Sequence, residues 1–247
     1  MKKVLITGGS SGIGLELAKC FAADDYEVVI TASNPDKLFT AKKTIEEKYK
    51  VPVSMYAMDL SKQGSAERLY EAVKMDGHVI DVLVNNAGIG TIGATEQIPL
   101  EKDEALMVLN MMAPVVLTKL FLKDMYARQS GRILNVCSTG AYQPGPFTST
   151  YYASKSFLLS YTKAVRYEAK SHGISVCALC PGTTATGFFE RADSKIPRGA
   201  MPAEQVAQYA YGQFKRGKAE IIPGLAFRLM KLCPVPIKTA VIAMIKR

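Results

Sequence analysis

The stretch Tyr151-Tyr152-Ala153-Ser154-Lys155 holds a phenol and an ammonium whose spacing allows them to act together. On a helix, Tyr151 and Lys155 lie four residues apart and therefore share one face. A nearby cation favours the phenolate form, so the pair suggests acid–base chemistry. An ordinary tyrosine has a pKa of about 10, and lowering it by about three units takes roughly 4 kcal/mol. Without further context, such a pair is more often a packed tyrosine and an exposed lysine on an amphipathic helix.

A glycine-rich loop near the N-terminus would bind the cofactor that this pair needs. It runs from Thr7 to Gly14 and joins an apolar run to a helical pattern. Glycines at this point allow a tight turn and let backbone N–H groups approach a pyrophosphate at the start of the helix. The position after a first strand is the context that this interpretation requires. The residues expected to bind a dinucleotide here are Gly8, Ser10, Ser11, Gly12, Ile13 and Gly14.

The elements that would position these residues alternate along the chain. Short apolar runs predict strands at residues 3–7, 27–31, 53–57, 82–84, 132–136, 174–179 and 220–222. Longer helical patterns predict helices at residues 12–23, 35–50, 66–74, 100–128, 151–171 and 202–216. Asn34-Pro35 and Ser61 are predicted helix starts. The alternation predicts an α/β, doubly wound Rossmann fold in a single domain, with about seven parallel strands and helices on both faces.

Charge and cysteine content exclude several classes of protein. The 31 basic and 22 acidic side chains give a net charge of +9, and +5 of it lies in residues 225–247. No basic stripe interleaved with aromatic residues occurs, so no nucleic-acid partner is predicted. Cys177 and Cys180 point to opposite faces of a strand and have no second ligand pair, which predicts buried thiols and no metal site. Five cysteines, no signal peptide and no apolar run long enough to span a bilayer predict a cytoplasmic protein.

The glycine spacing T-G-x-x-x-G-x-G resembles that of the short-chain dehydrogenase/reductase family, and further motifs follow in order. Asp59-Leu60 matches the position of the family's acidic residue beside the adenine. Asn85-Asn86-Ala87-Gly88 resembles the family's N-N-A-G motif, whose last three residues line the cofactor cleft. Pro181-Gly182 and Thr186 resemble the segment that closes over the nicotinamide. The resemblance covers about residues 3–186.

The resemblance also implies a catalytic set. Ser138 precedes Tyr151 by thirteen residues, as in the family's catalytic pair, and this step selects Tyr151 over Tyr152. Ser138 would hydrogen-bond the substrate oxygen, and Tyr151 would exchange the proton. Lys155 would lower the pKa of Tyr151 and hold the nicotinamide ribose. Asn110 would continue the proton path to solvent.

Several of these residues have simpler structural interpretations. Asp59 could sit in a turn before a helix capped by Ser61. Asn110 could be a surface helix residue, and Ser138 could be a strand-end hydroxyl bonded to backbone. Pro181-Gly182 could mark an ordinary turn.

The implied activity is hydride transfer between a nicotinamide and a carbonyl or secondary alcohol. An acidic side chain about twenty residues past the glycines would favour NAD(H), because it bonds the ribose 2′-OH and repels a 2′-phosphate. Ser33 and Asn34 occupy that region, and neither is acidic. With Lys37 nearby, the sequence predicts NADP(H) as the preferred cofactor, with NAD(H) not excluded. The alternatives are a non-catalytic dinucleotide-binding regulator or scaffold and a sugar epimerase or dehydratase.

The substrate is left open by the sequence. Phe188 and Phe189 are candidates for an apolar wall, in a loop at residues 183–201 that is expected to cover the substrate. Further residues at positions that border substrate in relatives are Ala94, Gln143, Pro144 and Phe147. An acyl chain, a sterol, a retinoid-like lipid or a small ketone would fit. Relatives also imply a homodimer or homotetramer, paired through the helices around Asn110 and Tyr151.

Residues 225–247 form a basic C-terminal extension outside the domain of residues 1–224. Pro234 and Pro236 are expected to break it into two short helices. In the second helix the apolar face is Ile237, Val241, Met244 and Ile245, and the cations are Lys238, Lys246 and Arg247. Packing on the domain or on a neighbouring subunit is the favoured interpretation. Peripheral contact with an anionic membrane is the alternative.

Overall fold

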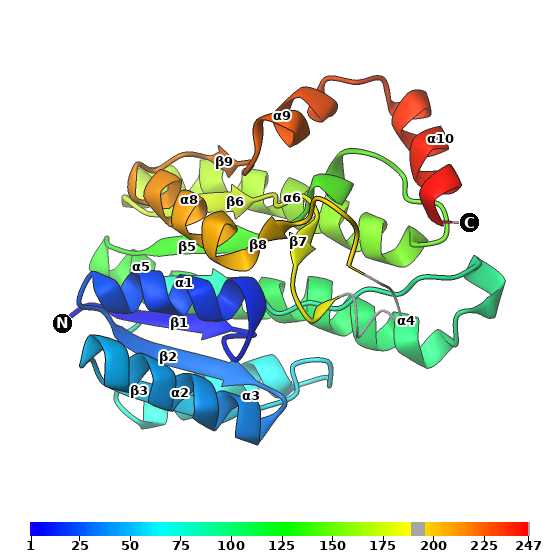
Figure 1. Ribbon diagram of the computed structural model, residues 1–247. Helices are drawn as coiled ribbons and strands as arrows, with labels where there is room; N and C mark the ends of the chain where they lie inside the picture. Colours follow the sequence, from blue (N-terminus) through cyan, green and yellow to red (C-terminus); the bar gives the residue numbers. More distant parts are fainter. Residues whose placement is uncertain (189–195, 247) are drawn as a thin grey trace.

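A seven-stranded, entirely parallel sheet lies at the centre of the protein (Figure 1), in a computed structural model that describes residues 1–188 and 196–246. The strand order is β3-β2-β1-β4-β5-β6-β9. The strands are β1 (Lys3–Thr7), β2 (Glu27–Ala32), β3 (Val53–Ala57), β4 (Val82–Asn85), β5 (Arg132–Val136), β6 (Ser175–Leu179) and β9 (Glu220–Ile221). The order reverses between β1 and β4, which is where doubly wound sheets bind ligands at their carboxyl ends. The predicted fold class and all seven predicted strands are confirmed.

Helices cover both faces of this sheet. One face carries α1 (Gly12–Ala23), α2 (Pro35–Tyr49) and α8 (Ala203–Lys215). The other face carries α3 (Ser65–Met75), α5 (Ala113–Arg128) and α6 (Ser149–Ala169). Val4 and Ile6 of β1 pack on the first face, and Leu5 packs on the second. A strand buried on both sides must be apolar at successive positions, which explains the continuous apolar runs of the sequence.

The long helix predicted at residues 100–128 is interrupted in the structure. It consists of α4 (Leu100–Met107), a π-helical turn η2 (Val108–Met112) and α5. Pro114 lies in the first turn of α5 and has no N–H. The carbonyl of Asn110, four residues earlier, therefore has no α-helical donor, and the N–H of Ala113 reaches back to the carbonyl of Val108 instead. The interruption places a π turn at Asn110, the kind of irregularity often found at functional sites.

The segment formed by α4, η2 and α5 corrects one expectation about membranes. Taken together, Leu100–Arg128 contains an 18-residue window that is long and apolar enough to cross a bilayer, with a mean hydropathy of 1.9. The sequence had been expected to contain no run of that length. In the fold, however, Leu117, Phe121 and Met125 of α5 are buried against the sheet, as in a core helix.

Of the two predicted helix starts, the one at Asn34 is confirmed and the one at Ser61 is wrong. Asn34 caps α2 as predicted, since its Oδ1 accepts a hydrogen bond from Lys37 N at 2.8 Å and Pro35 follows at the first helical position. Ser61 does not cap α3, which begins at Ser65 after Gly64 in a left-handed conformation. Ser61 instead donates from both N and Oγ to Asp59 Oδ1, at 3.0 and 2.7 Å. Ser61 therefore stabilises the turn around Asp59 and does not start the predicted helix.

The remaining elements are short. A second, two-stranded parallel sheet that was not predicted pairs β7 (Thr184–Ala185) with β8 (Met201–Pro202). The short 3-10 helices are η1 (Thr95–Gln97), η3 (Thr139–Tyr142) and η4 (Lys170–His172). Cys177 and Cys180 are buried in different core clusters, as expected for thiols on opposite faces of a strand.

The C-terminal extension forms two helices, as the prolines predicted. These are α9 (Leu225–Lys231) and α10 (Val235–Lys246), drawn in orange and red in Figure 1, where they arch above α6. The side chains of Ile245, Lys246 and Arg247 lie outside the described part of the chain.

The basic side chains of the extension that are described turn toward the domain. Arg228 Nε donates to Ile222 O at 2.9 Å. Lys231 pairs with Glu220, and Lys238 is buried. Lys238, one of the cations of the second predicted helix, is therefore turned away from solvent. These contacts support packing of the extension on its own domain.

Candidate active site

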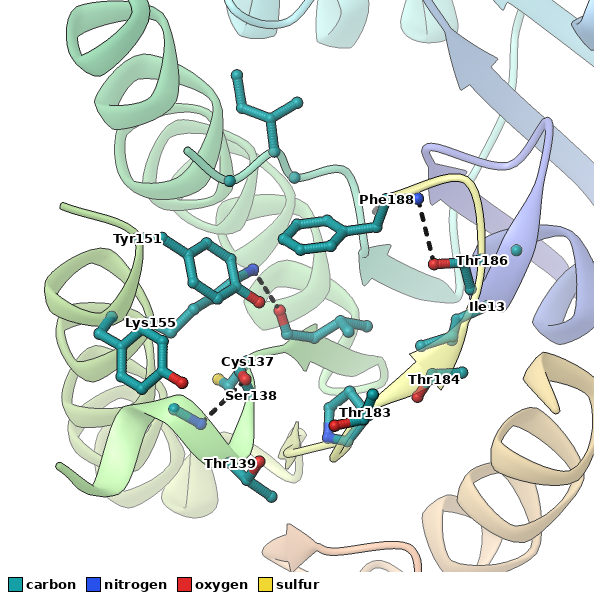
Figure 2. A pocket seen from close by; sticks show the side chains of 18 of the residues that line it. Ile13, Cys137, Ser138, Thr139, Tyr151, Lys155, Thr183, Thr184, Thr186 and Phe188 are labelled. Atoms are coloured by element: carbon teal, nitrogen blue, oxygen red, sulfur yellow. Dashed lines mark hydrogen bonds between the residues drawn. The ribbon is translucent and has the colours of Figure 1, made fainter. Parts of the chain in front are cut away.

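A cavity of about 630 Å³ lies at the carboxyl ends of the central strands. Its lining includes Ser33 and Asp59 after β2 and β3, the glycine loop after β1, and Ser138 and Tyr151 beyond β5. Figure 2 shows Tyr151, Ser138 and Lys155 grouped on one side and Ile13, Thr184 and Thr186 on the other. An elongated lining of this kind, past a glycine loop at the switch point, suits a dinucleotide.

The glycine loop is held against the end of β4 by Thr7 and Asn86. Thr7 Oγ1 accepts hydrogen bonds from the N–H groups of Asn86 and Ala87, each at 3.0 Å. Asn86 Nδ2 donates to Thr7 O at 2.8 Å and to Gly8 O at 3.2 Å. A Cβ atom on Gly14 would lie 2.3 Å from Gly8 O, so no larger residue fits at position 14. The missing side chain of Gly14 therefore lets the loop lie close to the end of β4, and Gly14 does not itself line the cavity.

Tyr151 and Ser138 meet at the wall of the cavity. Tyr151 lies in the first turn of α6, and Ser138 precedes η3 directly after β5. Burial raises the pKa of Tyr151 to about 12, and its hydrogen bond with Ser138 acts in the opposite direction. Ser138 Oγ also accepts from Gly140 N at 3.0 Å, which orients the hydroxyl. A hydroxyl and a phenol are thus placed to share one substrate oxygen.

Lys155 is buried directly behind Tyr151. Its Nζ donates to Val136 O at 2.9 Å and lies 5.9 Å from the centre of the Tyr151 ring. Burial lowers the pKa of the Lys155 ammonium, while the nearby thiols of Cys137 and Cys180 oppose this. Burial of the phenol is the largest cause of the raised pKa of Tyr151, and the lowering of this pKa by Lys155 stays a prediction.

Asn110 lies next to this group but does not line the cavity. Its Oδ1 accepts from Ile89 N at 3.0 Å, and its Nδ2 donates to Ile89 O at 2.9 Å and to Ser154 Oγ at 3.1 Å. The side chain is almost fully buried and fully engaged, so it is not the surface residue of the alternative interpretation. Its main-chain carbonyl lacks the α-helical donor that an N–H at position 114 would supply.

Most of the predicted cofactor residues come together in the cavity. Those that line it are Gly8, Ser10, Ser11, Gly12, Ile13, Ser33, Asp59, Leu60, Asn86, Ala87, Gly88, Tyr151, Lys155, Pro181, Gly182 and Thr186. Asn34 is absent from this lining, because its side chain caps α2. Asp59 lines the cavity and also accepts from Ser61 in the turn before α3, although Ser61 does not cap that helix.

Comparisons with known proteins agree with this geometry. A family model described as short chain dehydrogenase matches residues 2–197. The D-beta-hydroxybutyrate dehydrogenase of Cupriavidus necator is 31% identical over 206 residues, which cover 83% of this chain and 79% of that protein. The chain belongs to the short-chain dehydrogenase/reductase family.

Solved structures place this short-chain dehydrogenase among similar folds. A short-chain dehydrogenase from Sphingobium yanoikuyae, in complex with NADPH, is 27% identical with a TM-score of 0.88, covering 98% of this chain and 95% of that chain. A bulky-bulky ketone specific alcohol dehydrogenase from Comamonas testosteroni is 26% identical with a TM-score of 0.83, covering 98% and 94%. The protein is an NAD(P)-dependent oxidoreductase of this family that acts on CH–OH groups.

One wall of the cavity in this short-chain dehydrogenase was not predicted from the sequence. The C-terminal extension contributes to the lining through Phe227, Met230, Cys233, Ile237, Lys238, Val241 and Ile242. A Cβ atom on Gly182 would lie 2.2 Å from the Phe227 ring, so this glycine makes room for α9. The sequence pattern of the extension does not indicate that its helices face a cavity. The glycine at position 182 is the residue type that the contact with Phe227 requires.

The apolar wall expected at the substrate loop is present in part. Phe188 lines the cavity, and its ring centre lies 5.2 Å from that of Tyr151. Phe189 falls outside the described residues. Gln143 lines the cavity, whereas Ala94, Pro144 and Phe147 do not.

The raised pKa of Tyr151 predicts a protonated phenol in the short-chain dehydrogenase without added cofactor. A pKa of about 12 favours the neutral form relative to a free tyrosine at about 10, so Tyr151 should contribute no phenolate absorbance below about pH 11. The measurement is a pH titration of ultraviolet absorbance for the wild type minus Tyr151→Phe. A Tyr151 phenolate with a midpoint below pH 10 would contradict the dominance of burial.

Proposed function

We propose that the protein is an NADP(H)-dependent reductase or dehydrogenase that transfers a hydride between the nicotinamide and a carbonyl or secondary alcohol, with Tyr151 as general acid and base. The observation that carries this proposal is that Tyr151 and Ser138 line the same cavity as the glycine loop. A regulator or scaffold that binds a dinucleotide without catalysis would have no use for this pair.

The chemistry follows from where the two hydroxyls point. When bound, the nicotinamide supplies or accepts the hydride. During reduction, Ser138 donates a hydrogen bond to the carbonyl oxygen as negative charge develops on it, and Tyr151 delivers its proton to that oxygen. During oxidation, Tyr151 removes the alcohol proton. A pKa near 12 would make the phenolate too scarce near neutrality, so the working site must lower this pKa below its value in the described structure.

Lys155 and Asn110 support the proton transfer from behind. A Cβ atom on Gly88 would lie 3.2 Å from Asn110 Oδ1 and 3.3 Å from Lys155 Nζ, so both residues converge on this glycine. Lys155 Nζ can hold the nicotinamide ribose and stabilise a phenolate on Tyr151. The free carbonyl of Asn110, in its π turn, can hold a water that returns a proton to the site.

The preference for NADP(H) rests on the end of β2. Ser33 lines the cavity there and is exposed, and no acidic side chain accompanies it in the lining before Asp59. A 2′-phosphate would meet a hydroxyl and no carboxylate at this point. The NADPH-bound relative described above is in keeping with this assignment.

The central test of the catalytic assignment is Tyr151→Phe. This change should reduce kcat for NADPH-dependent reduction of bulky ketones by roughly 10²- to 10⁴-fold, because it removes the proton donor. Tyr152→Phe is the matched control, since Tyr152 lines the same cavity, and it should cost far less. Turnover that survives in Tyr151→Phe would remove Tyr151 as the acid, and no turnover in the wild type would favour the non-catalytic alternative.

The cofactor assignment predicts a specific effect of Ser33→Asp. A carboxylate here should lower the kcat/KM ratio of NADPH to NADH by about tenfold or more, equivalent to ~1.4 kcal/mol, because it repels the 2′-phosphate. Ser33→Ala, which adds no charge, is the control. A wild type with equal efficiency for both cofactors, or one that prefers NADH, would refute the assignment.

We also propose that two copies pair through the helices around Asn110 and Tyr151. Apolar side chains exposed on these helices are Leu100, Met107, Met112 and Phe157. Sedimentation should give a dimer or tetramer, and Phe157→Glu should shift it toward monomer. A wild-type monomer at micromolar concentration would contradict the proposal.

A further inference from the structure

Lys238 is a buried cation at the edge of the cavity. It lies on α10, is 6% exposed, and belongs to the cavity lining. Its Nζ approaches Tyr142 O at 3.3 Å and Lys231 O at 3.5 Å. Both contacts are long for hydrogen bonds, and an ammonium has three donors to satisfy. A buried charge whose contacts among the described residues are two long hydrogen bonds to carbonyls is poorly compensated.

No carboxylate compensates Lys238 within residues 1–188 and 196–246. Glu220 of β9, which accepts from Lys231 of the same extension, pairs with Lys163 and Lys231 instead. Among the described residues that line the cavity, the other charged side chains are Asp59, which accepts from Ser61, and Lys155, which donates to Val136. Lys238 therefore offers positive charge to the cavity with no negative partner from the described lining.

The surroundings of Lys238 suit an amphiphilic molecule. Tyr142 ends η3, which follows Ser138 directly, and four residues of 3-10 helix span roughly 8 Å. The Lys238 ammonium therefore lies on the substrate side of the cavity, away from Ser33 and Asp59. Apolar neighbours from the same extension are Phe227, Met230, Ile237, Val241 and Ile242.

We propose that Lys238 binds the carboxylate of the substrate, which is an oxo acid or hydroxy acid whose apolar part lies against α9 and α10. The inference rests on the proposed function for the carbonyl end of the substrate. The anion is a carboxylate, because its single charge matches the one ammonium that the extension contributes to the described lining. Charge at Lys238 and hydroxyls at Ser138 and Tyr151 together fix the substrate at both ends.

A purely structural role for Lys238 makes a different prediction. Lys231 O belongs to the last turn of α9, where cations commonly cap helix carbonyls. In that case Lys238 would stabilise the extension and would not discriminate between charged and neutral ligands. Binding selectivity therefore separates the two roles.

The test measures binding to the full-length protein by calorimetry, with 6-phenylhexanoate and its neutral amide as non-reducible probes. The wild type should bind the carboxylate about tenfold or more tightly than the amide, and Lys238→Met should lose this preference. Lys231→Met is the matched control, because Lys231 lies on the same extension, pairs with Glu220 and does not line the cavity. It should retain the preference, as should Lys238→Arg, which keeps the charge.

Three outcomes would overturn the inference. They are a wild type that binds acid and amide equally or binds neither, a Lys238→Met variant that keeps the preference, and a Lys238→Met variant whose only defect is a lower melting temperature. If Lys238→Met does not fold, Lys238→Gln takes its place in the same comparison. Carboxylate preference in a wild type that reduces no ketone would refute the proposed function and leave the anion site standing.

Discussion

The close approach of the glycine loop to the end of β4 is the constraint on which the rest of the site depends. Thr7 and Asn86 make this approach through four hydrogen bonds between two neighbouring parallel strands. Gly8 and Gly14 permit it because side chains there would collide with Asn86 or the backbone. The same strand end continues into Gly88, whose missing side chain admits Asn110 and Lys155. One set of backbone contacts thus positions both the cofactor cradle and the groups behind the catalytic phenol.

The catalytic side chains are placed by elements that approach this point from the other side. The first turn of α6 carries Tyr151, and the next turn buries Lys155 against the carbonyl of Val136 at the end of β5. Ser138 follows the same strand, so β5 and α6 together fix the spacing between hydroxyl and phenol. Pro114 contributes from four residues away, because its missing N–H removes the α-helical donor to the carbonyl of Asn110. Burial raises the pKa of the Tyr151 phenol, so the working site has to supply positive charge that favours the phenolate.

The sequence predicts what depends on local pattern and motif order. Apolar runs that alternate with helical patterns determine the sheet, since each parallel strand is buried on both faces. The thirteen-residue step between Ser138 and Tyr151 was recognised from the family motif, and it spans the short connection from the end of β5 to the first turn of α6. The π turn at Asn110 was missed, although Pro114 could have indicated it. Ser61 was assigned to a helix because a serine bonds equally well to a turn carboxylate.

The role of the C-terminal extension could not be predicted in the same way. Lys238 meets the carbonyl of Tyr142 across 96 residues of sequence, and nothing local to α10 indicates this contact. The same is true of Phe227, which packs where Gly182 leaves space. Basic residues in an amphipathic tail suggest solvent or membrane, whereas the tertiary structure turns those described toward the domain. Long-range packing, and not propensity, decides the shape of the substrate end of the cavity.

The most direct test of the central claim replaces Tyr151 with fluorotyrosine, whose phenol is more acidic, and follows the pH dependence of kcat/KM for oxidation of a secondary alcohol. If Tyr151 is the group that takes the alcohol proton, the limiting ionisation in the profile should move to lower pH in the fluorinated enzyme. A profile identical to that of the wild type would show that another group titrates, and would contradict the account.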